Sequence, residues 1–124
     1  MFKVDGTTIH CTRGDAGNIK FTVNNGEYKF AKDDVVTLKV YEKGNVDRVV
    51  LQKNVKITEV STSVIIELTS LDTKIGNVIN KPAKYWYEIS INDEHTVIGY
   101  DDDGAKEFIL YPEGGEKLWL KQKN

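Results

Sequence analysis

The sequence of 124 residues predicts an all-β fold, and two observations lead to this prediction. Short runs along most of the chain alternate apolar and polar residues with the two-residue period of a pleated strand. Residue pairs that favour tight turns separate several runs, at Asn25-Gly26, Lys43-Gly44 and Asp103-Gly104. Many short strands divided by turns are typical of a sandwich or a barrel, and we expect an antiparallel β-sandwich.

The clearest strand is expected from Lys84 to Asn92, in the segment KYWYEISIN. Its two alternating sets are Tyr85, Tyr87, Ile89 and Ile91, and Trp86, Glu88, Ser90 and Asn92. Because successive side chains of a strand point to opposite faces, the first set is predicted to face the core.

The same pattern predicts the other strands. In chain order, the expected strands are Thr7–Thr12, Asn18–Val23, Glu27–Phe30, Val35–Tyr41, Val46–Gln52, Val55–Val60, Ser63–Leu68, Lys84–Asn92, Thr96–Tyr100 and Lys106–Tyr111. The segment FTVNNGEYKF is typical of a complete hairpin. Besides the tyrosines and isoleucines above, the predicted core contains Ile19, Phe21, Val23, Val36, Leu38, Val40, Val64, Ile66, Leu68, Phe108 and Leu110.

The alternation stops between Leu68 and Lys84. We expect this segment to connect the two sheets, with a short helical turn around residues 70–80 and with Pro82 ending the irregular part.

One domain is expected over residues 1–124, because a chain of this length can bury one core and nothing divides the sequence. Cys11 is the only cysteine, so an intrachain disulfide is excluded, which suits folding in a reducing cytoplasm. Residues 114–124 are predicted to be a short tail or an extra edge strand. In this tail the apolar residues Leu118, Trp119 and Leu120 follow two glycines, and we take them as a candidate contact with a partner.

The net charge of −2 with 29% charged residues predicts a well-solvated, nearly neutral surface. Neither nucleic acid nor an anionic membrane is therefore an expected partner. The first residues contain no apolar run like that of a signal peptide, and no segment approaches the roughly 20 apolar residues of a membrane span. We expect synthesis in the cytosol.

Arg13-Gly14-Asp15 spells the tripeptide that many adhesive proteins present to integrins. Three residues are a weak signal, and a turn before the strand at Asn18 requires residues of this kind. A structural turn is favoured over adhesion.

No group of residues in the sequence predicts a catalytic, cofactor or metal site. The segment Asp101–Gly104 lacks the glycine and glutamate positions of a calcium loop, and a solvated hairpin turn is favoured. His10 and His95 are far apart in sequence, and Cys11 is predicted to point to the opposite strand face from His10. We expect no enzyme, no cofactor and no small-molecule substrate, and a site assembled across the fold is a distant third alternative.

Trp86 and Trp119 are the large apolar residues that the core pattern buries least easily. Exposed, they would mark a contact surface. The alternative for Trp86 is packing under the connection from Leu68 to Lys84, and the sequence leaves both interpretations open.

Several short motifs resemble, in their order, the immunoglobulin-like domain of phage tail and baseplate proteins from Gram-positive hosts, the type at the start of upper baseplate proteins. These motifs are Thr12–Asp15 (TRGD), Tyr28–Phe30 leading into Asp33–Asp34, Val36–Tyr41 (VTLKVY), Leu71–Thr73 (LDT), Tyr85–Ile89 (YWYEI) and Phe108–Glu113 (FILYPE). The likeness covers roughly residues 7–113. Two departures are Asp33, where the acidic turn usually has glycine, and the long insertion GNVINKPA before Tyr85.

The resemblance implies an immunoglobulin-like sandwich in which Tyr85 bonds back to the corner backbone and Tyr87 stands in place of the usual cysteine. It also implies that Arg13-Gly14-Asp15 is structural, because a similar tripeptide recurs at the first strand of these phage domains. The implied function is a non-enzymatic virion module, made in the bacterial host cytoplasm, that docks onto other phage structural proteins or onto copies of itself. The alternative is a carbohydrate-binding or adhesive surface module, which requires an exposed aromatic strip of Trp86, Trp119 or Tyr111.

Overall fold

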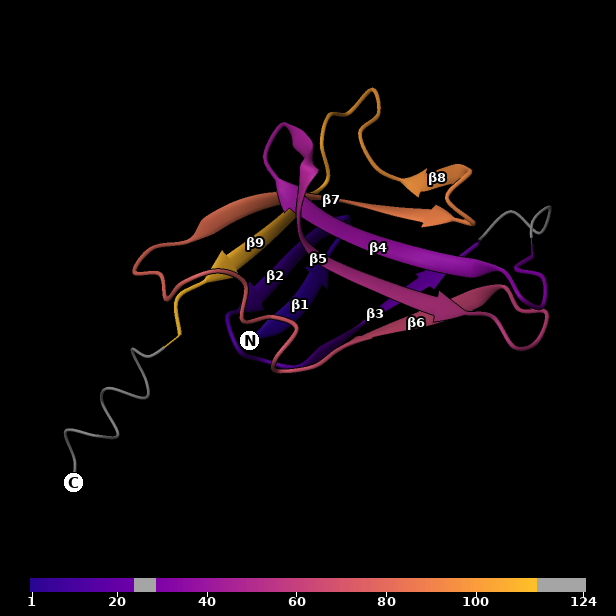
Figure 1. The fold of residues 1–124 in the computed structure, drawn as a ribbon, viewed down its shortest axis with the longest axis horizontal. Helices are drawn as coiled ribbons and strands as arrows, with labels where there is room; N and C mark the ends of the chain where they lie inside the picture. Colours follow the sequence, from indigo (N-terminus) through magenta and orange to yellow (C-terminus); the bar gives the residue numbers. More distant parts are fainter. Residues whose placement is uncertain (24–28, 114–124) are drawn as a thin grey trace.

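The computed structural model describes residues 1–23 and 29–113, and in this part of the chain all regular structure is β-strand. The strands are β1 (Phe2–Asp5), β2 (Thr8–Thr12), β3 (Gly17–Thr22), β4 (Val35–Glu42), β5 (Asn45–Lys56), β6 (Ser63–Leu68), β7 (Ala83–Ile91), β8 (His95–Ile98) and β9 (Glu107–Tyr111) (Figure 1). The large sheet has the order β1-β2-β9-β7-β4-β5, with β8 beside β7, and the small sheet consists of β3 and β6. The prediction of an all-β sandwich is confirmed.

Strand β7 is the centre of the large sheet. Along one side it pairs with β4 over most of its length, from Ile91 opposite Val36 to Tyr85 opposite Glu42. Its other side is shared, because β9 pairs with its first half and β8 with its last residues. All of these pairs are antiparallel, whereas β2 and β9, from the two ends of the described chain, pair in parallel. We had expected a purely antiparallel sheet from the sequence, and this parallel pair shows that the large sheet is mixed.

The core lies between the two sheets, where side chains of both belong to one buried cluster. The predicted core residues Ile19, Val36, Leu38, Val40, Val64, Ile66, Leu68, Tyr87, Ile89, Ile91, Phe108 and Leu110 are all buried. The other three predicted core residues, Phe21, Val23 and Tyr85, pack against this cluster and are partly buried. The two-residue period thus identified the inward faces correctly.

Two strand predictions are wrong. Strand β1 was not expected, because its segment FKVD has no clear apolar face, and its position comes from antiparallel pairing with β2. The expected strands Val46–Gln52 and Val55–Val60 are one strand, β5, whose pairing with β4 continues without interruption from Leu51 to Lys56. Lys53 and Asn54, which separate the two expected strands, instead lie within an edge strand, where polar side chains meet water.

The segment FTVNNGEYKF was predicted to form a hairpin, and its connection, residues 24–28, lies outside the described residues. On its described flanks, Phe21 pairs with Val64, and Phe30 forms an isolated bridge with Ser61. The acidic turn that follows places Asp33 at φ 74°, in the left-handed region that glycine usually occupies. Aspartate tolerates this region better than most residues, so the turn can form although glycine is absent.

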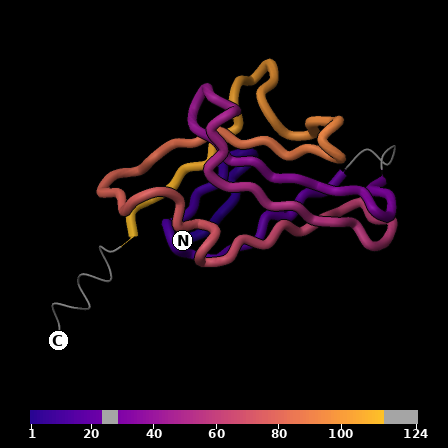
Figure 2. Tube along the Cα trace, viewed as in Figure 1, coloured from indigo at the N-terminus to yellow at the C-terminus, as the bar shows by residue number. Residues whose placement is uncertain are grey.

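The connection from β6 to β7 crosses from the small sheet to the large sheet, as predicted (Figure 2). It begins with one hydrogen-bonded turn, in which the Thr73 N–H donates to the Thr69 carbonyl at 3.3 Å. Thr69 and Asp72 each accept the other's backbone N–H through their side chains, at 3.1 and 2.8 Å, which is a capping box. The turn does not extend into a helix, and among the described residues there is no helix that is long and apolar enough to span a membrane.

Candidate functional site

The loop Arg13–Asp15 joins β2 to β3 and meets both the β6–β7 connection and the end of β9. Gly14 has φ 90°, a conformation that side-chain-bearing residues rarely adopt, and the Asp15 N–H donates to the Thr12 carbonyl at 2.9 Å. The tripeptide therefore forms a tight turn, as the sequence predicts from its residue types.

The Arg13 side chain points into the protein and only 8% of the residue is exposed. Its Nε donates to the Ile75 carbonyl at 3.2 Å and its Nη2 to the Gly76 carbonyl at 2.6 Å. Its Nη1 forms an ion pair with Glu113. An adhesive tripeptide must present its arginine to a receptor, whereas this arginine joins the β6–β7 connection to the end of β9.

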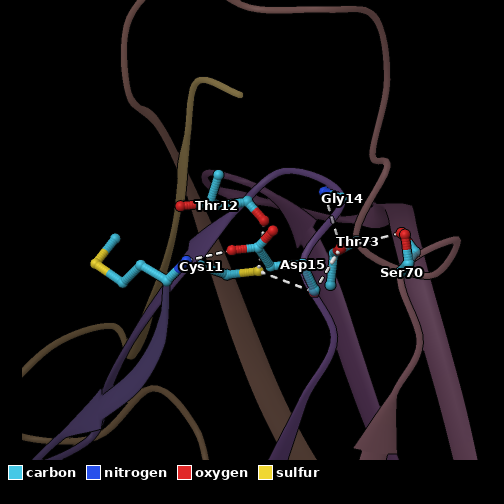
Figure 3. Close-up of polar contacts among 7 residues, drawn as sticks. Cys11, Thr12, Gly14, Asp15, Ser70 and Thr73 are labelled. Atoms are coloured by element: carbon cyan, nitrogen blue, oxygen red, sulfur yellow. Dashed lines mark hydrogen bonds and ion pairs between the residues drawn. The ribbon is translucent and has the colours of Figure 1, made fainter. Parts of the chain in front are cut away.

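Thr73 holds the other side of the loop and is completely buried (Figure 3). Its Oγ1 accepts the Gly14 N–H at 3.0 Å and lies within donating distance of the carbonyls of Asp15, at 2.9 Å, and Ser70, at 3.2 Å. The sequence alone assigns no role to Thr73. The Thr69-x-x-Asp72 capping box was the available signal, because it identifies the turn that brings Thr73 to this position.

Cys11 lies beneath the same loop, fully buried, with its Sγ 3.3 Å from the Thr12 carbonyl oxygen. Burial is the main cause that raises the pKa of the thiol from 9.0 to about 11. Only the thiolate acts as a nucleophile or metal ligand, so at neutral pH this thiol is inert. Within residues 1–23 and 29–113 no group of three histidine, cysteine or acidic side chains is placed to hold a metal ion.

The raised pKa of Cys11 predicts a loss of stability at alkaline pH. Between pH 9.0 and about 11 the unfolded chain releases the thiol proton while the folded chain keeps it, so the free energy of unfolding falls as the pH rises. The complete shift corresponds to about 2–3 kcal/mol. Urea unfolding across this pH range should give a shallower decline for Cys11→Ala than for the unsubstituted chain. Equal slopes would contradict the prediction.

The structure shows a hydrogen bond to the backbone from Tyr87, two residues after the Tyr85 to which the resemblance assigned one. The Tyr87 hydroxyl donates to the Thr7 carbonyl at 2.6 Å, and burial raises the pKa of Tyr87 to about 12. Tyr85 is only partly buried at the edge of the core. The register of β7 directs Tyr87 toward the β1–β2 turn, where the Thr7 carbonyl lies.

Trp86 lies on the outer face of the large sheet and packs against Tyr100, with ring centroids 5.8 Å apart and ring planes at 46°. Tyr100 is 70% exposed, and Trp86 is partly buried. Gly99 lies close to β7, because a Cβ at Gly99 would be 3.5 Å from the Glu88 Cβ, and it would also be 2.7 Å from the Thr96 methyl group. The neighbour that the structure gives Trp86 is Tyr100 of the β8–β9 connection. We call this pair the aromatic surface.

The structure also shows the surroundings of the two histidines and of the acidic loop that begins at Asp101. The His10 Nδ1 is hydrogen bonded to the Tyr111 hydroxyl at 2.7 Å, and His95 lies exposed on β8. Lys106 donates to the Asp101 carboxylate at 2.7 Å and so helps to hold the pKa of Asp101 below its usual value. The predicted contact residues Leu118, Trp119 and Leu120 lie outside the described residues.

Three comparisons with known proteins were negative. No protein-family model, no curated protein and no solved structure matches the chain. The likeness to phage baseplate domains therefore stays a prediction that rests on the order of its motifs.

Proposed function

We propose that this domain is a non-catalytic interaction module of a phage tail or baseplate, which docks onto other virion proteins or onto copies of itself. The observation that carries the proposal is the aromatic surface, where Tyr100 is 70% exposed beside Trp86 on the outside of a well-packed sheet. Tryptophan and tyrosine are enriched where proteins contact each other, and they supply much of the binding energy there. The assignment to a virion is supported by the motif order alone.

The edge of the large sheet supports the same proposal. Strand β5 has 12 residues and pairs only with β4 among the described strands, so one row of its backbone groups faces outward. Val46 and Val49 on this strand are 50% and 41% exposed. An exposed strand edge can accept a strand from a partner, which is a common way of joining proteins through the backbone.

Binding measurements with the tail and baseplate proteins of the encoding phage test the proposal, together with light scattering for self-association. The chain is expected to bind one of these proteins or itself. Tyr100→Ala should weaken that binding by about tenfold or more, as expected for an interface residue that contributes over 1 kcal/mol. Val60→Ala, at a valine that is 65% exposed on another loop, is the control and should bind normally. A strict monomer without such a partner, encoded away from tail and head genes, would contradict the proposal.

A carbohydrate-binding module is the second candidate, because the same aromatic surface offers ring faces to a sugar. The ring planes are tilted by 46°, so they form a bent platform in place of a flat one. A glycan array separates the two functions. Glycan binding by the unsubstituted chain that is lost in Trp86→Ala would favour the carbohydrate function. If neither the unsubstituted chain nor Trp86→Ala binds a glycan, the interaction module is favoured.

A further inference from the structure

An apolar groove lies in the long connection before β7, in the insertion that departs from the phage pattern. It has a volume of about 490 Å³ and is lined by Val78, Ile79, Asn80, Lys81, Pro82 and Ala83. Val78 is 73% exposed, whereas Ile79 packs against the core and holds the loop in place. Grooves of this volume enclose small ligands or a few side chains.

The chain arrives beside this groove at the end of β9. Leu110 pairs with Ala83, the last residue of the groove, so the residues after Leu110 run along the loop (Figure 1). Glu113 is fixed there by its ion pair with Arg13, which also binds the Ile75 and Gly76 carbonyls at the start of the same loop. The described part of the chain therefore ends, at residue 113, beside the loop that forms the groove.

The segment that follows, residues 114–124, has the sequence GGEKLWLKQKN. Two glycines come first and allow the chain to reverse direction, since glycine adopts both signs of φ. The apolar residues Leu118, Trp119 and Leu120 follow, with a lysine on each side. At about 3.4 Å per extended residue, Trp119 can reach up to about 20 Å from Glu113, which is enough to turn back onto the adjacent loop.

We propose that the groove of residues 78–83 binds the apolar segment Leu118–Leu120 of the same chain. The side chains of the groove are mostly apolar, and the indole ring and two leucines of residues 118–120 form an apolar group that begins five residues after Glu113. A linker of only four residues, 114–117, gives an effective concentration on the order of mM, so the chain's own segment occupies the groove before a second copy does. This contact lies within one chain and does not depend on the phage assignment. The contact and the proposed function can therefore fail independently of each other.

Fluorescence of Trp119 tests the proposal in the full chain carrying Trp86→Phe, which leaves Trp119 as the only tryptophan. Docking should give blue-shifted emission, and acrylamide should quench it about threefold more slowly than in the unfolded chain, because the indole is removed from water. Adding Val78→Asp, a change at a largely exposed position, should abolish both effects. Val60→Asp, at another exposed loop valine, is the matched control and should abolish neither. Unfolding midpoints show that each variant is folded, and Val78→Ser replaces Val78→Asp if the charge disturbs the loop.

Three results would overturn the proposal. The first is Trp119 emission that already matches the unfolded chain. The second is protection that survives both substitutions at Val78 or that is lost equally in Val60→Asp. The third is protection that grows with protein concentration, which would assign the groove to the segment of a second copy and not to the same chain.

Discussion

Arg13→Ala is expected to lower the free energy of unfolding by about 3–5 kcal/mol, the cost typical of breaking a buried ion pair by removing one partner. The substitution removes three interactions at once: the donors to the Ile75 and Gly76 carbonyls and the counter-charge of Glu113. The side chains of Arg13 and Glu113 are only 10% and 16% exposed, so water replaces these interactions poorly. Urea unfolding followed by circular dichroism measures the loss.

Arg48→Ala is the matched control for this experiment. Arg48 also pairs with a glutamate, Glu42, but at 3.7 Å and with a side chain that is 63% exposed. Exposed pairs of this kind contribute about 0–1 kcal/mol. Arg13→Lys keeps the charge but not the planar fork that reaches two carbonyls and a carboxylate, so it should fall between the two. Equal losses for Arg13→Ala and Arg48→Ala would show that the Arg13 contacts do not stabilise the fold.

The strand pattern was predictable wherever one face of a strand is buried. Strand β6 has the predicted bounds, and it alternates buried Val64 and Ile66 with exposed Ile65 and Glu67. Burial of one face imposes a period of two on the sequence, and this period is readable without any knowledge of the neighbours.

The pattern failed where a strand lies at a sheet edge. Strands β1 and β5 form the two edges of the large sheet, and most of their residues are exposed. The period is therefore missing in β1 and interrupted in β5, and only pairing with the neighbouring strand shows where these strands begin and end.

The sites depend on contacts between residues far apart in the chain, and a single sequence contains little information on them. Arg13 contacts Glu113 across 100 positions and Ile75 across 62. Trp86 meets Tyr100 because Gly99 allows the chain to approach the sheet. At Arg13-Gly14-Asp15 the residue types correctly favoured a structural turn over an adhesive motif. The partners that hold this turn are visible only in the fold.

Thr73→Val is expected to lower the free energy of unfolding by about 2–4 kcal/mol, although valine has nearly the same shape as threonine. The substitution removes the hydroxyl that accepts the Gly14 N–H and bonds the Asp15 carbonyl inside the protein. A buried donor or acceptor that loses its partner costs about 1–3 kcal/mol. Hydrogen exchange offers a local measurement, because the Gly14 amide should exchange much faster in the variant.

Two controls separate the hydroxyl from the packing. Thr73→Ser keeps the hydroxyl and removes one methyl group, so it should cost only about 1 kcal/mol and leave the Gly14 amide protected. Thr37→Val removes another buried threonine hydroxyl, whose partner at 3.0 Å is the exposed side chain of Asn54. Because Asn54 can turn to water, this change should cost about 1 kcal/mol or less. If Thr73→Val is no more harmful than Thr37→Val, the turn at Arg13-Gly14-Asp15 does not depend on Thr73, and Arg13 alone must hold it.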